Sequence, residues 1–154
     1  MNDPVDALTG AIDYDAALIL DAEELAEQGV AEAHEGLSTQ LCELGIAPAA
    51  VSENVDADAG TYTVQSGGTD YPISGLSIPA SHSWGLATFA LFDIVNQQLA
   101  GHRLALYAIN GGNDLFGIFM TPTQAERARR ALPRKSDWPY MPTAEPDWFG
   151  MYHD

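Results

Sequence analysis

Two carboxylates with one residue between them begin the pattern of a calcium-binding loop. Asp56 and Asp58 precede Gly60, and Ca²⁺ is bound through closely spaced carboxylate oxygens. The complete loop requires a third oxygen ligand, then a glycine, and a glutamate at its twelfth position. These three positions hold Gly60, Thr61 and Gly67. The pattern therefore fails, and the segment predicts a turn that leads into a strand.

The histidines and the single cysteine, Cys42, do not form a metal site in the sequence. None of the four histidines has the HExxH or His/Cys spacing of a zinc site, and one cysteine cannot build a structural site. The glycine-rich pieces at 66–68 and 110–113 lack the lysine, the Ser/Thr and the following helix of a phosphate loop. We therefore expect no metal and no cofactor.

A serine before an apolar helix offers the clearest catalytic pattern. The string Ser81-His82-Ser83-Trp84-Gly85 resembles the nucleophile elbow of α/β-hydrolases, with Ser83 as nucleophile and His102 or His153 as base. However, serine replaces the first glycine of that motif, and Pro79 interrupts the preceding strand. A helix N-cap explains the same residues. We expect no enzyme, and a small hydrolase using Ser83 remains an alternative.

The basic residues are confined to one part of the chain. The 154 residues include 6 Lys and Arg, and none of them lies in residues 1–102. Of the 22 acidic residues, 16 lie in that same segment, so it carries the whole net charge of −16. Five of the basic residues lie at the C-terminal half of the last predicted helix or just after it, where they complement the helix dipole. We also expect these basic residues to form ion pairs with acidic residues of 1–102. A phosphate-binding patch is the alternative role for them.

This charge distribution excludes some classes of partner. Nucleic-acid binding requires a basic footprint, which residues 1–102 lack. The longest apolar stretch, 84–95, contains Asp93 and is shorter than the ~20 residues that span a bilayer. The acidic N-terminus has no apolar run, and the single Cys42 excludes an internal disulfide. We expect a cytoplasmic protein with a cationic protein partner, no direct nucleic-acid binding and no membrane association.

The first half of the chain predicts one helix and one hairpin. Residues 1–15 are expected to be flexible. Asp21 and Glu24 have capping-box spacing, so a helix is expected from there to residue 44, with bends at its glycines. Residues 47–58 resemble a loop. The segments 61–65 and 69–73 alternate polar and apolar residues around a glycine turn, which predicts a hairpin.

The second half predicts a buried helix, a buried hairpin and an aromatic arm. Residues 84–99 are apolar nearly all round, with Ser81 or Ser83 as the expected cap. Continuous apolar runs at 104–109 and 115–120 indicate strands that are covered on both faces. Pro122 opens the last helix, which ends before Pro133. The whole is an α+β fold, a single domain over 16–154 with an antiparallel sheet of hairpins and about three helices, in which 133–154 wraps the body as an irregular aromatic arm.

A small acidic domain without a motif for a cofactor, a metal or a nucleophile resembles the immunity proteins that neutralise secreted bacterial toxins. The resemblance is to the class and is carried by acidity and size, with no diagnostic motif. It implies a stoichiometric complex in which an acidic surface blocks a cationic toxin domain. An acidic adaptor or chaperone for a secreted effector is an alternative with the same charge.

The residues expected to face the partner lie on predicted loops and strand ends. Carboxylates there can be presented without burial, and two tyrosines on the same predicted hairpin could anchor the complex. The loops around 53–71 are the expected centre of recognition, and charge reversal at Asp56 and Asp58 should slow association with the partner. The candidates are Asp13, Asp15, Glu53, Asp56, Asp58, Tyr62, Asp70 and Tyr71.

Overall fold

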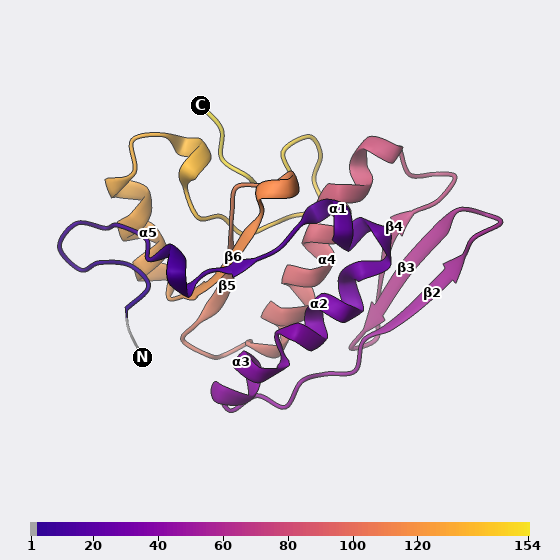
Figure 1. The fold of residues 1–154 in the computed structure, drawn as a ribbon, viewed down its shortest axis with the longest axis horizontal. Helices are drawn as coiled ribbons and strands as arrows, with labels where there is room; N and C mark the ends of the chain where they lie inside the picture. Colours follow the sequence, from indigo (N-terminus) through magenta and orange to yellow (C-terminus); the bar gives the residue numbers. More distant parts are fainter. Residues whose placement is uncertain (1–2) are drawn as a thin grey trace.

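Two antiparallel sheets lie on either side of a central helix, α4 (Ser83–Gln98), in the computed structural model, which describes residues 3–154 (Figure 1). One sheet has the strand order β2-β3-β4 and the other β1-β6-β5. The strands are β1 (Leu18–Ile19), β2 (Ser52–Asp56), β3 (Thr61–Ser66), β4 (Thr69–Ser74), β5 (Ala105–Ile109) and β6 (Phe116–Met120). The fold is therefore α+β, as predicted, with two small sheets rather than one.

The first sheet contains the predicted hairpin and one strand that was not predicted. Gly67 and Gly68 connect β3 to β4 with φ of 57° and 80°, which glycine adopts without steric cost. The expected loop at 47–58 instead contains β2, which pairs along β3 from Ser52 to Asp56. All five residues of β2 are exposed. Its sequence therefore has no burial alternation by which a strand could be recognised.

The second sheet is covered on both faces, as its apolar strands predicted. In β5, Leu106 and Ala108 belong to the core that contains α4, whereas Tyr107 and Ile109 belong to a second core with α5 (Pro122–Ala131). This alternation follows from the two-residue repeat of a strand. Thr121 caps α5 in a complete capping box with Gln124.

Helix α4 is the centre of the larger core. Ala87, Leu91, Phe92 and Val95 are fully buried, and the helix contacts both β4 and β5. The predicted serine cap is wrong: a 3₁₀ turn at Ala80–His82 leads directly into the helix, and the cap position makes no side-chain hydrogen bond. Across residues 3–154 no helix has the length and apolar character needed to cross a bilayer.

The helix predicted for 21–44 is broken into pieces. They are α1 (Ala22–Glu24), a wide π-type turn (Leu25–Gly29), α2 (Val30–Gly36) and α3 (Ser38–Glu43). Asp21 caps α1 by accepting from the backbone N–H of Glu23. The chain leaves the helical conformation at Glu27 and at Gln28, whose φ is +68°. The predicted helix therefore has a kink, formed next to Gly29.

The C-terminal segment 133–154 has no regular helix longer than one 3₁₀ turn, and its middle is bound to the second sheet. Tyr140 exchanges two backbone hydrogen bonds with Ala108 at the outer edge of β5, and its hydroxyl donates to the carbonyl of Asn110. The indole of Trp138 donates to the carbonyl of Leu132. The arm thus closes an edge that β5 would otherwise expose.

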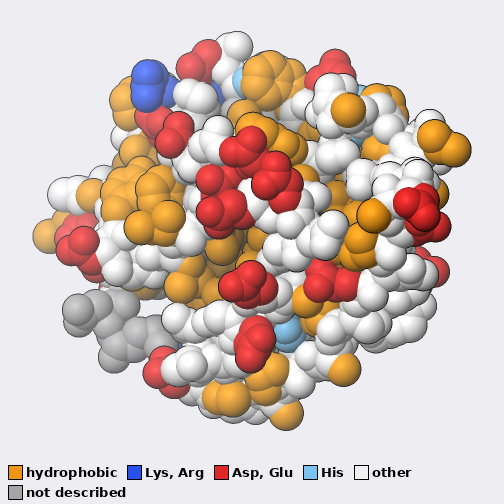
Figure 2. Space-filling model, turned by 45° about the vertical axis from the view of Figure 1, so that its right-hand side comes forward, with side chains coloured by type: hydrophobic (Ala, Val, Ile, Leu, Met, Phe, Trp, Pro, Cys, Tyr) orange, Lys and Arg blue, Asp and Glu red, His pale blue; other side chains and the backbone are white. Residues whose placement is uncertain are grey.

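The acidic and basic side chains remain apart in space. In the face shown in Figure 2, acidic side chains gather near the centre among hydrophobic ones, and the basic side chains in view are confined to its upper edge. Two of the three ion pairs among residues 3–154, Arg130–Glu126 and Arg134–Asp137, are local to the C-terminal third. Only Arg127 reaches an acid of the first part, Asp3, at 3.9 Å. The acidity of residues 3–102 is therefore almost entirely uncompensated.

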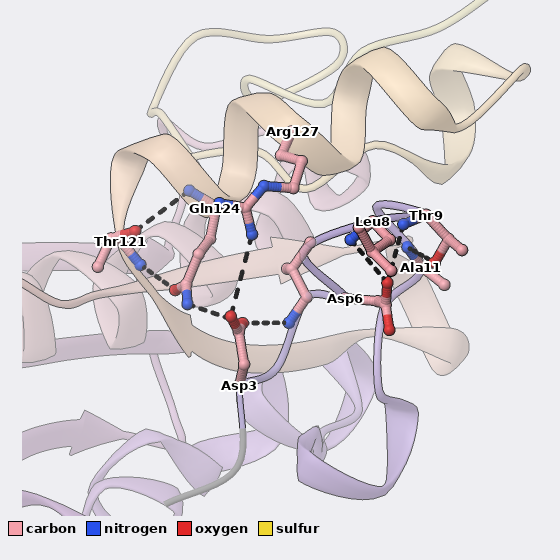
Figure 3. Close-up of polar contacts among 9 residues, drawn as sticks. Asp3, Asp6, Leu8, Thr9, Ala11, Thr121, Gln124 and Arg127 are labelled. Atoms are coloured by element: carbon pink, nitrogen blue, oxygen red, sulfur yellow. Dashed lines mark hydrogen bonds and ion pairs between the residues drawn. The ribbon is translucent and has the colours of Figure 1, made fainter.

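The N-terminal segment, which was expected to be flexible over residues 1–15, contacts α5. Figure 3 shows the carboxylate of Asp3 in contact with Arg127 and accepting from the amide of Gln124, both on α5. Val5 is fully buried in the second core, and Gly10 packs against Ala131. Residues 3–15 are docked because their few apolar side chains complete the core around α5. Residues 1 and 2 lie outside the described part.

Candidate functional site: an acidic groove beside β1

A groove of about 600 Å³ lies between β1 and the kinked helix α1–α2. Its apolar lining includes Leu18, Leu20, Leu25, Ala33 and Leu37. Its carboxylates come from Asp21, Glu24, Glu27 and Glu32. Among residues 3–154, no basic side chain lines it. The groove therefore combines an apolar lining with a negative rim.

The kink in the helix shapes this groove. A Cβ on Gly29 would lie 2.3 Å from the carbonyl oxygen of Glu24, so no other residue fits there without a shift of the backbone. Gln28 adopts a left-handed conformation that costs about 1–2 kcal/mol for a residue with a Cβ. Residues 27–29 all line the groove. Strain of this kind is characteristic of binding and catalytic sites, where the surrounding structure maintains it.

A second hollow of about 420 Å³ continues the acidic surface on the other side of α2. Glu32 lines both hollows, and the second also contains Glu35 and Glu53. We call the surface formed by these two hollows the acidic face. Its carboxylates are Asp21, Glu24, Glu27, Glu32, Glu35 and Glu53.

The carboxylates of the acidic face are spread along it rather than gathered at a point. Within residues 3–154 no three His, Cys, Asp or Glu side chains are grouped closely enough to hold a metal ion. Glu24, Glu27, Glu32 and Glu35 are all exposed, so water screens their mutual repulsion. Such an arrangement suits several separate cationic side chains of one partner.

The structure does not bring the predicted partner-facing acids together. Asp13 and Asp15 lie at a 3₁₀ turn close to α5, at the far end of the molecule from β2 and β3 (Figure 1). In the first sheet, residues directly opposite share a face. Glu53, paired with Val64, therefore points to the buried side, and Asp70, paired with Gln65, to the other.

The predicted calcium-like loop is a turn, as expected, and presents its acids away from the groove. Asp56 Oδ1 accepts from the backbone N–H groups of Asp58 and Ala59, which closes the turn between β2 and β3. Of the predicted acids, only Glu53 belongs to the acidic face.

The two tyrosines predicted as anchors for a partner are core residues instead. Tyr62 and Tyr71 are 2% and 5% exposed. The Tyr62 hydroxyl accepts from the backbone N–H of Val30 at 3.2 Å and donates to Glu53. Burial, followed by the hydrogen bond to Glu53, raises the pKa of Tyr62 above its usual value. Tyr62 thus fixes the start of α2 to the first sheet, and it is not available as a surface anchor.

Tyr71 has the equivalent position on β4. Its hydroxyl donates to Asp93 Oδ2 of α4 at 2.6 Å. Burial and this carboxylate together raise the pKa of Tyr71. The alternation in 69–73 correctly indicated that Tyr71 shares a face with Ile73, but that face is the buried one.

Ser83 and the histidines proposed as its base are engaged elsewhere. Ser83 is the first residue of α4, where the chain continues from a 3₁₀ turn rather than from a strand. His102 Nδ1 accepts from the backbone N–H of Leu104, and the ring of His153 stacks on Trp148 at 4.2 Å. The strand–turn–helix geometry that a nucleophile elbow requires is therefore not present at Ser83.

Sequence reasoning overlooked the acids of the kinked helix, because the six glutamates of the helix predicted for 21–44 are ordinarily its solvated face. The available signal was Gln28-Gly29 in the middle of the predicted helix. A glycine there weakens a helix by about 1 kcal/mol relative to alanine, and here it creates the hollow. Comparison of the chain with protein-family models, with curated proteins and with solved structures gave no match.

Proposed function

We propose that this chain is a binding protein that occupies a cationic protein partner through the acidic face, in the manner of an immunity protein acting on a toxin domain. The observation that carries the proposal is the groove beside β1, where the part of the chain that the structure describes contributes four carboxylates and an apolar lining but no basic side chain. The proposal includes a cytoplasmic location, where such a partner would be neutralised before its export.

The physical chemistry of the acidic face favours a protein partner over a small ion. Complementary charges accelerate the encounter between proteins, and buried apolar contacts at the centre slow dissociation. The groove supplies both, since the partly or fully exposed side chains of Leu18, Ile19 and Leu20 line it together with the carboxylates. Phosphate-bearing partners such as nucleic acids would be repelled by the same carboxylates.

The experiment is a matched pair of charge-reversed baits. The variant Glu24→Lys/Glu32→Lys changes the acidic face, and the control Asp58→Lys/Asp70→Lys makes the same change in net charge on the first sheet. Each immobilised bait captures, at low salt, the product of the gene adjacent to its own. We expect wild type and the control to retain this protein and to block its toxicity in growing cells, and the groove variant to bind about tenfold more weakly.

The salt dependence and the control decide the outcome. Affinity should fall steeply between about 50 and 300 mM salt, because exposed charges are screened within roughly 10 Å at 0.1 M. An affinity that does not change with salt would contradict the electrostatic basis of the proposal. If the control loses binding and the groove variant does not, recognition takes place at residues 53–71, as the sequence alone predicted.

An acidic adaptor or chaperone for a secreted effector is a second candidate, favoured by the strand edge that borders the groove. Such a protein would hold an unfolded segment of its partner instead of blocking a folded active site. The two functions differ in what happens to the partner. An inhibitor abolishes the activity of the bound toxin domain, whereas a chaperone leaves the activity of the folded domain unchanged.

A further inference from the structure

Within the described residues 3–154, the backbone of β1 is paired on one side only. Leu20 donates its N–H to the carbonyl of Leu115 at 2.9 Å, and Leu18 lies opposite Gly117 of β6. Hydrogen-bonded and non-hydrogen-bonded pairs alternate along an antiparallel ladder. Ile19, which lies between these two residues, therefore points its N–H and C=O away from β6. Its side chain is 85% exposed, and within residues 3–154 it is in the outermost strand of its sheet.

This open edge is one wall of the groove. Residues 18–21 line one side, and residues 24–37 of the kinked helix contribute the other lining residues. An unpaired strand edge is a template for another strand. Peptide recognition often uses such an edge, with backbone hydrogen bonds providing affinity and side-chain pockets providing specificity. The edge of β5 in the same sheet is already occupied by Tyr140, so β1 is the one that can accept a strand.

We propose that the groove receives an extended, basic segment of the partner, which adds to β1 as a fourth strand of its sheet. The inference rests on the proposed function and specifies how the partner is held. The backbone of the segment pairs with Ile19. On alternate positions its apolar side chains pack on the leucines of the groove, and its Lys or Arg side chains reach the carboxylates of Glu24, Glu27 and Glu32.

The negative charge of the groove favours a basic segment of the partner over a second copy of this chain. A segment of this chain could satisfy the groove only if it were both basic and extended. Its basic run, however, lies in α5 and the turn that follows, where Arg127, Arg130 and Arg134 have acidic partners. A single small cation is also a poor match, because the carboxylates do not converge.

The test uses synthetic peptides with the full-length protein. An octapeptide of alternating Lys and Val is the probe. Two control peptides have the same charge and side chains but are N-methylated at every second residue, one at the odd and the other at the even positions; we call them the two N-methylated registers. Binding at low salt is measured by changes in the NMR chemical shifts of the backbone amides and by fluorescence anisotropy. We expect the first peptide to shift the Ile19 amide and to bind at least about tenfold more tightly than one of the two N-methylated registers. Spermine is a further arm that carries charge without a peptide backbone.

The variant Ile19→Pro removes the outward N–H without removing a bond to β6, and a proline is tolerated at an edge of this kind. Ile19→Val keeps the N–H and is its matched control. We expect Ile19→Pro to lower affinity for the Lys-Val peptide by about tenfold, and Ile19→Val to leave it unchanged. The far-ultraviolet circular dichroism spectrum identifies a variant that has failed to fold, in which case the N-methylated peptides decide.

The outcomes separate this inference from the proposed function. If both N-methylated registers and spermine bind as well as the Lys-Val peptide, strand addition is wrong, and the acidic face remains a purely electrostatic site. If the peptide induces dimers or shifts residues remote from β1, the groove is not its site, which also overturns the inference. If the adjacent gene product binds normally to Ile19→Pro and to wild type but not to Glu24→Lys/Glu32→Lys, only the strand addition fails.

Discussion

At the scale of single residues, a buried histidine reports on the contact between α2 and α4. His34 is 4% exposed, and its Nε2 lies 2.8 Å from the side-chain nitrogen of Gln98. The amide oxygen of Gln98 accepts from the backbone N–H of Ala49 at 2.8 Å, which leaves its NH₂ group facing the ring. The imidazole is therefore held neutral, as a hydrogen-bond acceptor. Burial lowers the pKa of His34 below its usual value.

A loss of stability in mild acid follows from the lowered pKa of His34. The unfolded chain binds a proton at about pH 6.5, whereas the folded chain binds it only at lower pH. The contribution of His34 is therefore fully present above that pH and is lost as the pH falls. Urea unfolding of wild type between pH 8 and 5 should show this loss, and His34→Gln, which keeps a hydrogen-bond acceptor, should show less of it. Identical pH profiles for the two proteins would contradict the assignment.

Tyr62 shows what a residue pattern can and cannot indicate. Alternation correctly placed Tyr62 and Val64 on one face of β3. Whether that face meets solvent, a partner or the body of the protein depends on what packs against it. Here α2 covers it and uses the Tyr62 hydroxyl as an acceptor for Val30. An anchor and a core residue have the same sequence signature, because both are large aromatic side chains on an apolar face.

At the scale of elements, the kink between α1 and α2 determines whether the groove exists. Helix propensity and capping indicated the correct start, since Asp21 caps α1. The low helix propensity of glycine predicted bends at Gly29 and Gly36 alike. It could not indicate that the chain leaves the helical conformation only next to Gly29, because the energy of that kink depends on tertiary contacts. Leu25 and Val30 are buried on either side of it, and burial of such side chains contributes about 1.5–3 kcal/mol each. That gain offsets the strain at Gln28.

Two glycines of this region give a matched pair of variants. A Cβ on Gly29 would overlap the carbonyl oxygen of Glu24, whereas one on Gly36 has nothing within 4 Å. We expect Gly29→Ala to lower the free energy of unfolding by about 2 kcal/mol, within the range of overpacked sites. Gly36→Ala should leave it unchanged or raise it by up to about 1 kcal/mol, through helix propensity. Chemical denaturation measures both. Equal effects would show that residue 29 is not constrained by the kink.

The strands differ in how far their sequences predict them: the buried strands β5 and β6 were predicted, and the edge strands β1 and β2 were not. β5 and β6 were predicted because both of their faces are buried, which gives continuous apolar runs. The strand β2 was not predicted, because its residues are exposed and its stability comes from backbone pairing with β3. β1 has two residues, fewer than any periodicity can detect. The site borders this short edge strand, the element that sequence patterns indicate least.

At the scale of the whole molecule, the net charge of −16 is distributed over a surface of 8288 Å². Three ion pairs among residues 3–154 offset little of it. Carboxylates that repel one another destabilise the compact state, and salt reduces that repulsion. The same charge that would attract a cationic partner therefore lowers the stability of the free protein.

Added salt should accordingly stabilise the free protein while it weakens the complex. We expect the Tm to rise by about 3 °C between 10 and 300 mM NaCl, which corresponds to roughly 1 kcal/mol for a domain of this size. Both charge-reversed double variants should show a smaller rise, because each removes four units of negative charge. A Tm that is independent of salt would indicate that the acids are too far apart to interact.

Four features could be established without the structure: the charge asymmetry, the α+β class, the buried hairpin of β5 and β6, and the helix α5 that begins at Pro122. These depend on local composition and on periodicities that a buried face imposes on neighbouring residues. Long-range packing settled which acids share a surface. Asp21, Glu32 and Glu53 lie along one surface because the kinked helix packs against α4, with β1 beside one hollow and β2 beside the other. The position of a charge in space depends on such long-range packing, whereas its place in the chain does not.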